Sequence, residues 1–172
     1  MPSVIVKQPF VISGYGMYLP DEIETSKELS SKINKTEDWI ISRTGVVERR
    51  ISSIDVDKMG AIAAEEAGID LLLVRAFPEL KEIRKAAPKT FISVSIPFIK
   101  YSSKYDIVKD ALEIIDMGFD SITCGSWNLD FMKYLNSFRI PIQGHAGLVP
   151  RRSTWTGGMK AVGRTFKSAT QL

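Results

Sequence analysis

His145 is the only histidine of the chain, and it lies between two glycines in the segment Gly144-His145-Ala146-Gly147. An imidazole at the end of a strand could act as an acid, a base or a hydrogen-bond donor to a substrate oxygen. The alternative is a loop histidine bonded to the backbone. The flanking glycines indicate close approach of the backbone to another group, so we hold His145 as a candidate catalytic residue.

Cys124 is the only cysteine. A thiol becomes a nucleophile when a base lies nearby, and His145 is the candidate base if the strands carrying the two residues are neighbours. The alternative is a small buried hydrophobic side chain, the commoner role of a free cysteine. A lone cysteine excludes an intramolecular disulfide and a CxxC metal or redox pair, so we expect a reducing compartment, the cytoplasm.

Two further clusters could bind a ligand. Lys160 and Arg164 lie in a stretch with Gly157, Gly158 and Gly163, and such a basic loop could cradle an anion through backbone N–H groups. It matches neither the P-loop nor the Rossmann fingerprint.

Trp39 and Arg43 are four residues apart on a predicted helix and therefore share a face. An indole and a guanidinium together could sandwich a planar base such as adenine. The alternative is an ordinary surface helix with a half-buried tryptophan.

The elements that must position these residues show two patterns. Residues 10–13 predict a short strand, Thr25 with Glu28 predicts a capping box at the start of a helix to residue 33, and a second helix is predicted between Thr36 and Gly45. Beyond residue 56, helices and strands alternate. Helices are expected over 57–67, 78–87, 104–117 and 129–138, and strands over 69–74, 90–96, 121–124 and 140–144.

That alternation predicts an α/β fold with a parallel sheet, either doubly wound or a barrel. In such folds chemistry occurs at the carboxyl ends of the strands, which is where Ser95, Cys124 and His145 fall.

Composition narrows the class of protein. The 172 residues are 44% hydrophobic and 25% charged, which argues against a disordered, collagen-like or simple coiled-coil chain. No run of eighteen apolar residues exists, so we expect no membrane partner. Seven basic and no acidic residues follow Asp130. Without an aromatic platform beside them, we interpret them as a solvated face and do not expect a nucleic-acid partner.

The N-terminal part resembles beta-ketoacyl-ACP synthase III. The resemblance covers roughly residues 10–65 and rests on the segment from Gly14 to Pro20 and on the run Trp-Ile-Ile-Ser-Arg-Thr-Gly-Val-Val-Glu-Arg-Arg from Trp39 to Arg50. It implies that Trp39 and Arg43, with Thr44, bind coenzyme A. The segment with the family's catalytic cysteine has no counterpart in this chain.

From about Ala63 onward the chain resembles ketopantoate hydroxymethyltransferase. The matching stretches are 67–74, 95–98 and, most specifically, 140–150 with 157–164. The resemblance implies a (β/α)8 barrel of the phosphoenolpyruvate/pyruvate superfamily. Its members transfer a hydroxymethyl group from methylenetetrahydrofolate to α-ketoisovalerate, with Mg²⁺ stabilising an enolate. His145 matches an active-site histidine of that family.

The departures from this second family concern its charged residues. Its two metal-binding aspartates fall at Ala76 and Ser95, and the lysine and glutamate of its fourth strand fall near Thr123 and Gly125. The position of its general-base glutamate lies beyond Leu172. We therefore do not expect a Mg²⁺ site.

These observations lead to one set of expectations. The fold is α/β, a partial (β/α) barrel-like parallel sheet preceded by a thiolase-like N-terminal segment, with domains at 1–62 and 63–172. The function is that of a ketopantoate-hydroxymethyltransferase-like protein, incomplete or catalytically impaired, that binds a small oxoacid or anion. Any retained activity would be hydroxymethyl or acyl transfer.

The alternatives are a module that binds acyl-CoA and a non-catalytic scaffold. Because half a barrel leaves strand edges unpaired, we also expect a homo-oligomer or a partner subunit.

Overall fold

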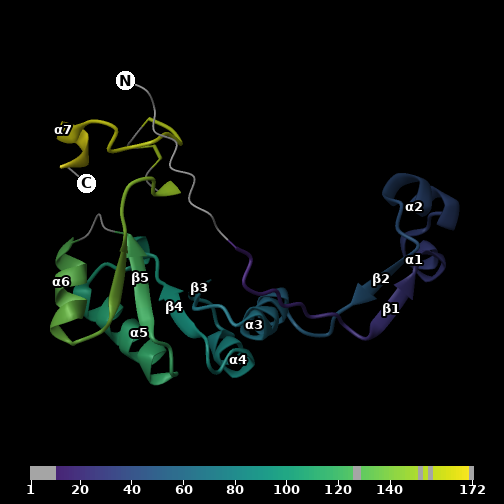
Figure 1. Ribbon diagram of the computed structural model, residues 1–172, viewed down its shortest axis with the longest axis horizontal. Helices are drawn as coiled ribbons and strands as arrows, with labels where there is room; N and C mark the ends of the chain where they lie inside the picture. Colours follow the sequence, from purple (N-terminus) through teal and green to yellow (C-terminus); the bar gives the residue numbers. More distant parts are fainter. Residues whose placement is uncertain (1–10, 126–128, 151–152, 155–156, 171–172) are drawn as a thin grey trace. The chain divides into compact units, whose positions relative to one another are not determined.

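The computed structural model describes residues 11–125, 129–150, 153–154 and 157–170. It forms two compact units that divide between Ile69 and Asp70 (Figure 1). The domain boundary predicted between residues 62 and 63 separates two family resemblances, and it stays a prediction.

The first unit contains an antiparallel strand pair and three helices. Strands β1 (Glu22–Thr25) and β2 (Glu48–Ile51) pair with Glu22 opposite Ile51. The helices are α1 (Ser26–Ile33), α2 (Glu37–Thr44) and α3 (Val56–Ala67). The sequence analysis missed both strands, because they are four residues long and rich in charge, without the apolar alternation that marks a strand.

The strand predicted at residues 10–13 is wrong over its described part. Residues 11–13 form no strand, and Phe10 lies outside the described residues. Val11 and Ile12 are 84% and 82% exposed. These apolar residues therefore do not pack against a sheet. A short strand without a partner strand gains no inter-strand hydrogen bonds and is not stable.

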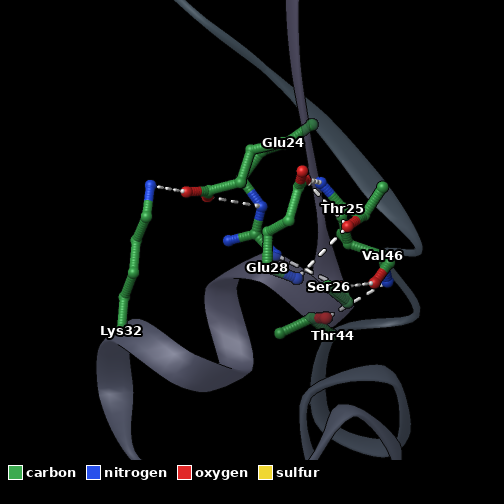
Figure 2. Close-up of polar contacts among 8 residues, drawn as sticks. Glu24, Thr25, Ser26, Glu28, Lys32, Thr44 and Val46 are labelled. Atoms are coloured by element: carbon green, nitrogen blue, oxygen red, sulfur yellow. Dashed lines mark hydrogen bonds and ion pairs between the residues drawn. The ribbon is translucent and has the colours of Figure 1, made fainter.

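The predicted capping box of α1 is confirmed (Figure 2). The Thr25 hydroxyl accepts a hydrogen bond from the Glu28 amide at 3.2 Å, and the Glu28 carboxylate accepts one from the Thr25 amide at 2.7 Å. The bond from the Thr25 amide, and a second one at 2.9 Å in which the Thr25 hydroxyl donates to the same carboxylate, lower the pKa of Glu28, since both favour the charged form. Helix α2 begins after Thr36 and ends at Gly45 in the left-handed conformation, both as predicted.

A buried carboxylate ties β1 to its neighbours. Glu24 is only 8% exposed, and its oxygens lie 2.6 Å from the Lys32 ammonium and 3.8 Å from Nε of Arg49 (Figure 2). Next to it the buried Ser26 hydroxyl donates to the Val46 carbonyl at 2.7 Å. Charge pairing and this bond hold the start of α1 against the chain that leads into β2.

Two glycines allow an extended segment to lie directly on α3. A Cβ on Gly16 would come within 2.0 Å of the Ala63 carbonyl oxygen, and one on Gly14 within 2.6 Å of the Ala67 carbonyl oxygen. Side chains at these two positions would force the segment away from the helix. The Met17 amide beside them donates to the Glu66 carboxylate at 3.1 Å.

The second unit confirms the predicted α/β class with a four-stranded parallel sheet. Its strands lie in the sequential order β3-β4-β5-β6, at Leu71–Arg75, Phe91–Ser95, Ser121–Gly125 and Ile142–His145. The connecting helices are α4 (Leu80–Ala86), α5 (Lys104–Asp116) and α6 (Leu129–Ser137), and a short α7 (Phe166–Ala169) follows. The sequence placed every one of these strands and connecting helices within a few residues of its position.

The sheet has a helix face and an open face. Parallel crossovers are right-handed, so a sequential strand order places α4, α5 and α6 on the same face. Ile92, Val94 and Ile122 point to this helix face and are fully buried. The opposite face, here called the open face because none of the three connecting helices lies on it, carries the alternate residues; Ser93 and Ser121 at its centre are buried, whereas Leu71 and Leu73 on β3 are exposed. Leu73, Ser93 and Ser121 form one of its rows across three strands.

An ion pair between Arg84 and Asp120 lies at the amino end of the sheet. The Arg84 guanidinium donates to the Asp120 carboxylate at 2.6 Å, and to the carbonyls of Ala87, Pro88 and Thr90. The same Asp120 oxygen accepts the Ile92 amide at 2.8 Å. This network joins the end of α4 to the starts of β4 and β5.

Among the described residues, no helix is long and apolar enough to cross a membrane.

Candidate functional site

A cavity of about 280 Å³ lies at the carboxyl end of the parallel sheet. Its lining comes from the ends of all four strands and the loops after them, and the polar residues that contribute to it are Arg75, Ser95, Lys100, Thr123, Cys124 and His145. Loops that leave the same end of parallel strands converge there. The position of this cavity is therefore a consequence of the strand order.

The three residues predicted as catalytic from the sequence come together here. Ser95 ends β4, Cys124 lies near the end of β5, and His145 ends β6, and all three line the cavity. Of the two glycines that flank His145, only Gly144 has a close neighbour, since a Cβ there would lie 3.0 Å from Cε of Met132 on α6, whereas one on Gly147 would meet nothing within 4 Å.

A row of polar residues crosses the open face at the cavity, and three of its four members line it. Arg75, Ser95, Thr123 and Gln143 are register partners on the four strands. The Thr123 hydroxyl is the centre of a short network, since it lies 2.6 Å from the Ser93 hydroxyl and donates to Oε1 of Gln143 at 3.1 Å. Ser93 and Thr123 are buried, so the network fixes the orientation of side chains beneath the ligand position.

Cys124 and His145 lie on neighbouring strands but project to opposite faces. Cys124 is paired with Gly144, whereas His145 is paired with Gly125, one residue further along. Because side chains alternate along a strand, the thiol points to the helix face. Burial there raises the pKa of Cys124 to about 12, which disfavours the thiolate that a nucleophile requires.

Two cationic residues of the cavity were missed by the sequence analysis. Arg75 is the last residue of β3, and Lys100 ends the short 3-10 turn Phe98–Lys100 after β4. The signal was available for Arg75, since it occupies a strand end of the kind at which chemistry was expected. Lys100 lies five residues beyond its strand, and only the fold of that turn brings it back to the cavity.

Lys160 and Arg164, predicted to bind an anion, are not among the residues that line this cavity. The ammonium of Lys160 lies close to Gly157, 3.2 Å from where a Cβ would stand. Gly157, Gly158 and Gly163 all have positive φ. The described part of the glycine-rich loop thus has the expected backbone character, at a position separate from the cavity lining.

The donor set of the cavity does not suit a Mg²⁺ ion. Hard divalent cations take oxygen ligands, chiefly carboxylates, and the described residues that line the cavity include none. Nor does any cluster of three or more His, Cys, Asp or Glu side chains suited to a metal occur within the described ranges. Arg75 and Lys100 place positive charge there instead, which favours an anion.

The residues predicted to bind coenzyme A lie on α2 in the first unit. Trp39 is 44% exposed, and its ring is flanked by Nζ of Lys35 at 5.4 Å and by the Arg43 guanidinium at 5.9 Å. Thr44 has a local role, because its hydroxyl donates to the Ile40 carbonyl at 2.8 Å and accepts the Val46 amide at 3.1 Å.

Sequential parallel β-α units with a polar cavity at their carboxyl end define a protein of the β/α-barrel type, present here as four strands. A family model described as ketopantoate hydroxymethyltransferase matches residues 64–172. The chain belongs to the ketopantoate hydroxymethyltransferase family, as the sequence resemblance predicted.

Individual relatives agree with both resemblances. Over 94 residues the chain is 34% identical to 3-methyl-2-oxobutanoate hydroxymethyltransferase of Buchnera aphidicola. The matched stretch covers 54% of this chain and 36% of that protein. It is 47% identical over 58 residues to beta-ketoacyl-[acyl-carrier-protein] synthase III of Pectobacterium atrosepticum, covering 33% of this chain and 18% of the synthase. The chain therefore spans well under two thirds of the length of either relative.

A solved structure of 3-oxoacyl-(acyl carrier protein) synthase III from Pseudomonas aeruginosa is similar at 24% identity and a TM-score of 0.38, covering 48% of this chain and 30% of that one.

Proposed function

We propose that the second unit binds a small oxoacid, such as 3-methyl-2-oxobutanoate, in the cavity at the carboxyl end of its sheet, without Mg²⁺ and without hydroxymethyl transfer by this chain alone. One observation carries the proposal. The four positions at which the family resemblance places charged groups, Ala76, Ser95, Thr123 and Gly125, all line the cavity, and all four side chains are neutral.

The cations that remain suit a carboxylate ligand. Arg75 offers a planar guanidinium that can bind a carboxylate with two hydrogen bonds. Lys100 adds a second positive charge from the turn after β4, and the lining also holds His145 and the hydroxyl residues Ser95 and Thr123. In the family reaction Mg²⁺ would polarise the oxoacid, whereas here protein cations would hold it as an anion, and the described residues of the lining offer no carboxylate to serve as a base.

A single NMR signal tests the binding. His145 is the only histidine, so the imidazole resonance of the chain reports on the cavity without assignment ambiguity. We expect titration with 3-methyl-2-oxobutanoate to shift this resonance to the same extent with and without Mg²⁺. Absence of a shift, or a shift that requires Mg²⁺, would contradict the proposal.

Matched variants locate the ligand. Arg75→Gln should weaken binding about tenfold, as loss of a charge-assisted contact does, and Lys100→Gln should act in the same direction. Arg164→Gln and Lys104→Gln change the same residue types outside the lining and should leave the affinity unaltered. If Arg164→Gln weakened binding as much as Arg75→Gln, the ligand would lie elsewhere. We expect no hydroxymethyl transfer from methylenetetrahydrofolate in any of these proteins.

A second candidate function belongs to the first unit. The half-exposed Trp39, with two cations within 6 Å of its ring, favours binding of the planar, polyanionic end of coenzyme A, because indole faces stack on bases and the cations attract phosphates. The indole N–H signal of Trp39 should shift when coenzyme A is added. Arg43→Ala and Lys35→Ala should abolish the shift, and Lys27→Ala, an exposed lysine on α1, should preserve it.

If neither ligand shifts its reporter signal, the chain is a scaffold without small-molecule ligands of these two classes. We also propose the cytoplasm as its location, on the grounds of its single cysteine.

A further inference from the structure

We propose that two copies of this chain associate through the open faces and strand edges of their second units, so that their two four-stranded sheets close one eight-stranded parallel barrel. This proposal does not depend on ligand binding. It follows from three features of the sheet: an open face with exposed apolar side chains, two complementary edges, and opposite charges at the same end of those edges.

The open face has the character of an interior. Parallel sheets are covered on both faces in folded proteins, and here the three connecting helices all cover the other face. Leu71, Leu73 and Phe91 on the open face are 46%, 54% and 44% exposed. They are register neighbours on β3 and β4, so they form a continuous apolar patch rather than scattered single residues.

The two edges of the sheet are complementary to each other. The outer strands of the sheet are β3 and β6, and no other strand of the described residues pairs with either, so each presents backbone groups along one side that a further strand could bind. A two-fold axis parallel to the strands preserves strand direction. It brings β3 of one copy against β6 of the other, and β6 of the first against β3 of the second. Eight parallel strands are the number at which such a barrel closes with its interior filled by side chains.

Charge at the amino ends of these edges fits the same pairing. Asp70 directly precedes β3, and Arg139 precedes β6 by a few residues, and both are exposed. The two-fold arrangement places Asp70 of each copy at the same end as Arg139 of the other. At the carboxyl end it places Arg75 of one copy beside His145 of the other, so the second copy would contribute a cation to each cavity. A second copy of this chain is therefore the occupant that we favour over an unrelated protein.

Light scattering with size exclusion on the full chain tests the association. We expect a mass of twice 19.2 kDa. Leu73→Lys would place a charge inside the closed barrel while leaving the single chain unaffected, since Leu73 is exposed there. This variant should weaken the dimer at least about a hundredfold. The control Leu112→Lys makes the same change at an exposed leucine of α5, and it should remain dimeric. Circular dichroism confirms that both variants fold.

A charge exchange tests the orientation. Asp70→Lys and Arg139→Asp should each weaken the dimer about tenfold, because each places like charges together twice in the symmetric assembly. The double variant should restore the affinity of the unaltered chain. A 19.2 kDa monomer, a dimer unaffected by Leu73→Lys, or a double variant as weak as either single one would overturn the proposal.

Discussion

Cys124 illustrates how the surroundings of a residue decide its chemistry. Its neighbour on β6 carries the only histidine, which from the sequence made a nucleophile and base conceivable. The pleat of the sheet separates them, since Cys124 is paired with Gly144 rather than with His145. Its thiol is 1% exposed, and Sγ lies 3.8 Å from the Gln143 carbonyl oxygen. Desolvation therefore holds it in the neutral form.

We expect Cys124 to react with iodoacetamide near neutral pH much more slowly than the same thiol in the unfolded chain. Its pKa is raised from 9.0 to about 12. Folding thus favours the protonated thiol, and this contribution is complete below pH 9 and is lost as the pH rises towards 12. Between these values the free energy of unfolding should fall less steeply with pH in Cys124→Ala than in the unaltered chain. A native alkylation rate equal to the unfolded one would contradict this assignment.

At the scale of elements, short helices of the first unit depend on their caps. Helix α1 has eight residues, too few to be stable alone. It is held by the Thr25–Glu28 capping box at its start and by Asn34 in the left-handed conformation at its end. The capping box was readable from the sequence because it is a local contact between residues three positions apart, whereas the role of Asn34 was not predicted.

Thr25→Ala should destabilise α1 by about 1 kcal/mol, since it removes the hydroxyl that accepts the Glu28 amide. Thr25→Ser retains that hydroxyl and should lower the stability by only a small part of this free energy. The Glu28 carboxylate adds a pH dependence, because its pKa is lowered on folding from the usual value of 4.5. Its contribution to the stability of the folded chain is therefore present above pH 4.5 and is lost as the pH falls through the lowered pKa. Urea unfolding monitored by circular dichroism measures both effects, and equal stability of the alanine and serine variants would refute the role of the cap.

At the scale of the whole molecule, the chain consists of two units that carry resemblances to two different enzyme families. The second unit belongs to the ketopantoate hydroxymethyltransferase family but carries four parallel strands among its described residues. Its cavity retains the histidine of the family resemblance and lacks carboxylates in its described lining.

Because the units are compact separately, we expect the full chain to unfold in two steps. Thr25→Ala should shift the transition of the first unit alone. Asp120→Ala should shift that of the second by about 2 kcal/mol, because it leaves the Arg84 guanidinium and the Ile92 amide without their shared partner. A single transition that both variants shift equally would show that the two units unfold as one.

The sequence by itself determined the elements of the second unit, the caps of α1 and α2, and the family. These depend on local spacing: apolar periodicity, capping residues and left-handed glycines act over a few residues. The strand ends named from that pattern, at Ser95, Cys124 and His145, do meet at one cavity, because sequential parallel strands end at the same edge.

Only the tertiary structure decided the rest. It showed that β1 and β2 form a charged antiparallel pair, since that pairing joins segments more than twenty residues apart and leaves no periodic signal. It brought Lys100 back to the cavity and turned Cys124 to the opposite face from His145. Which side chains share a site depends on register and on the path of turns between strands, and those are fixed by long-range packing rather than by neighbours in the chain.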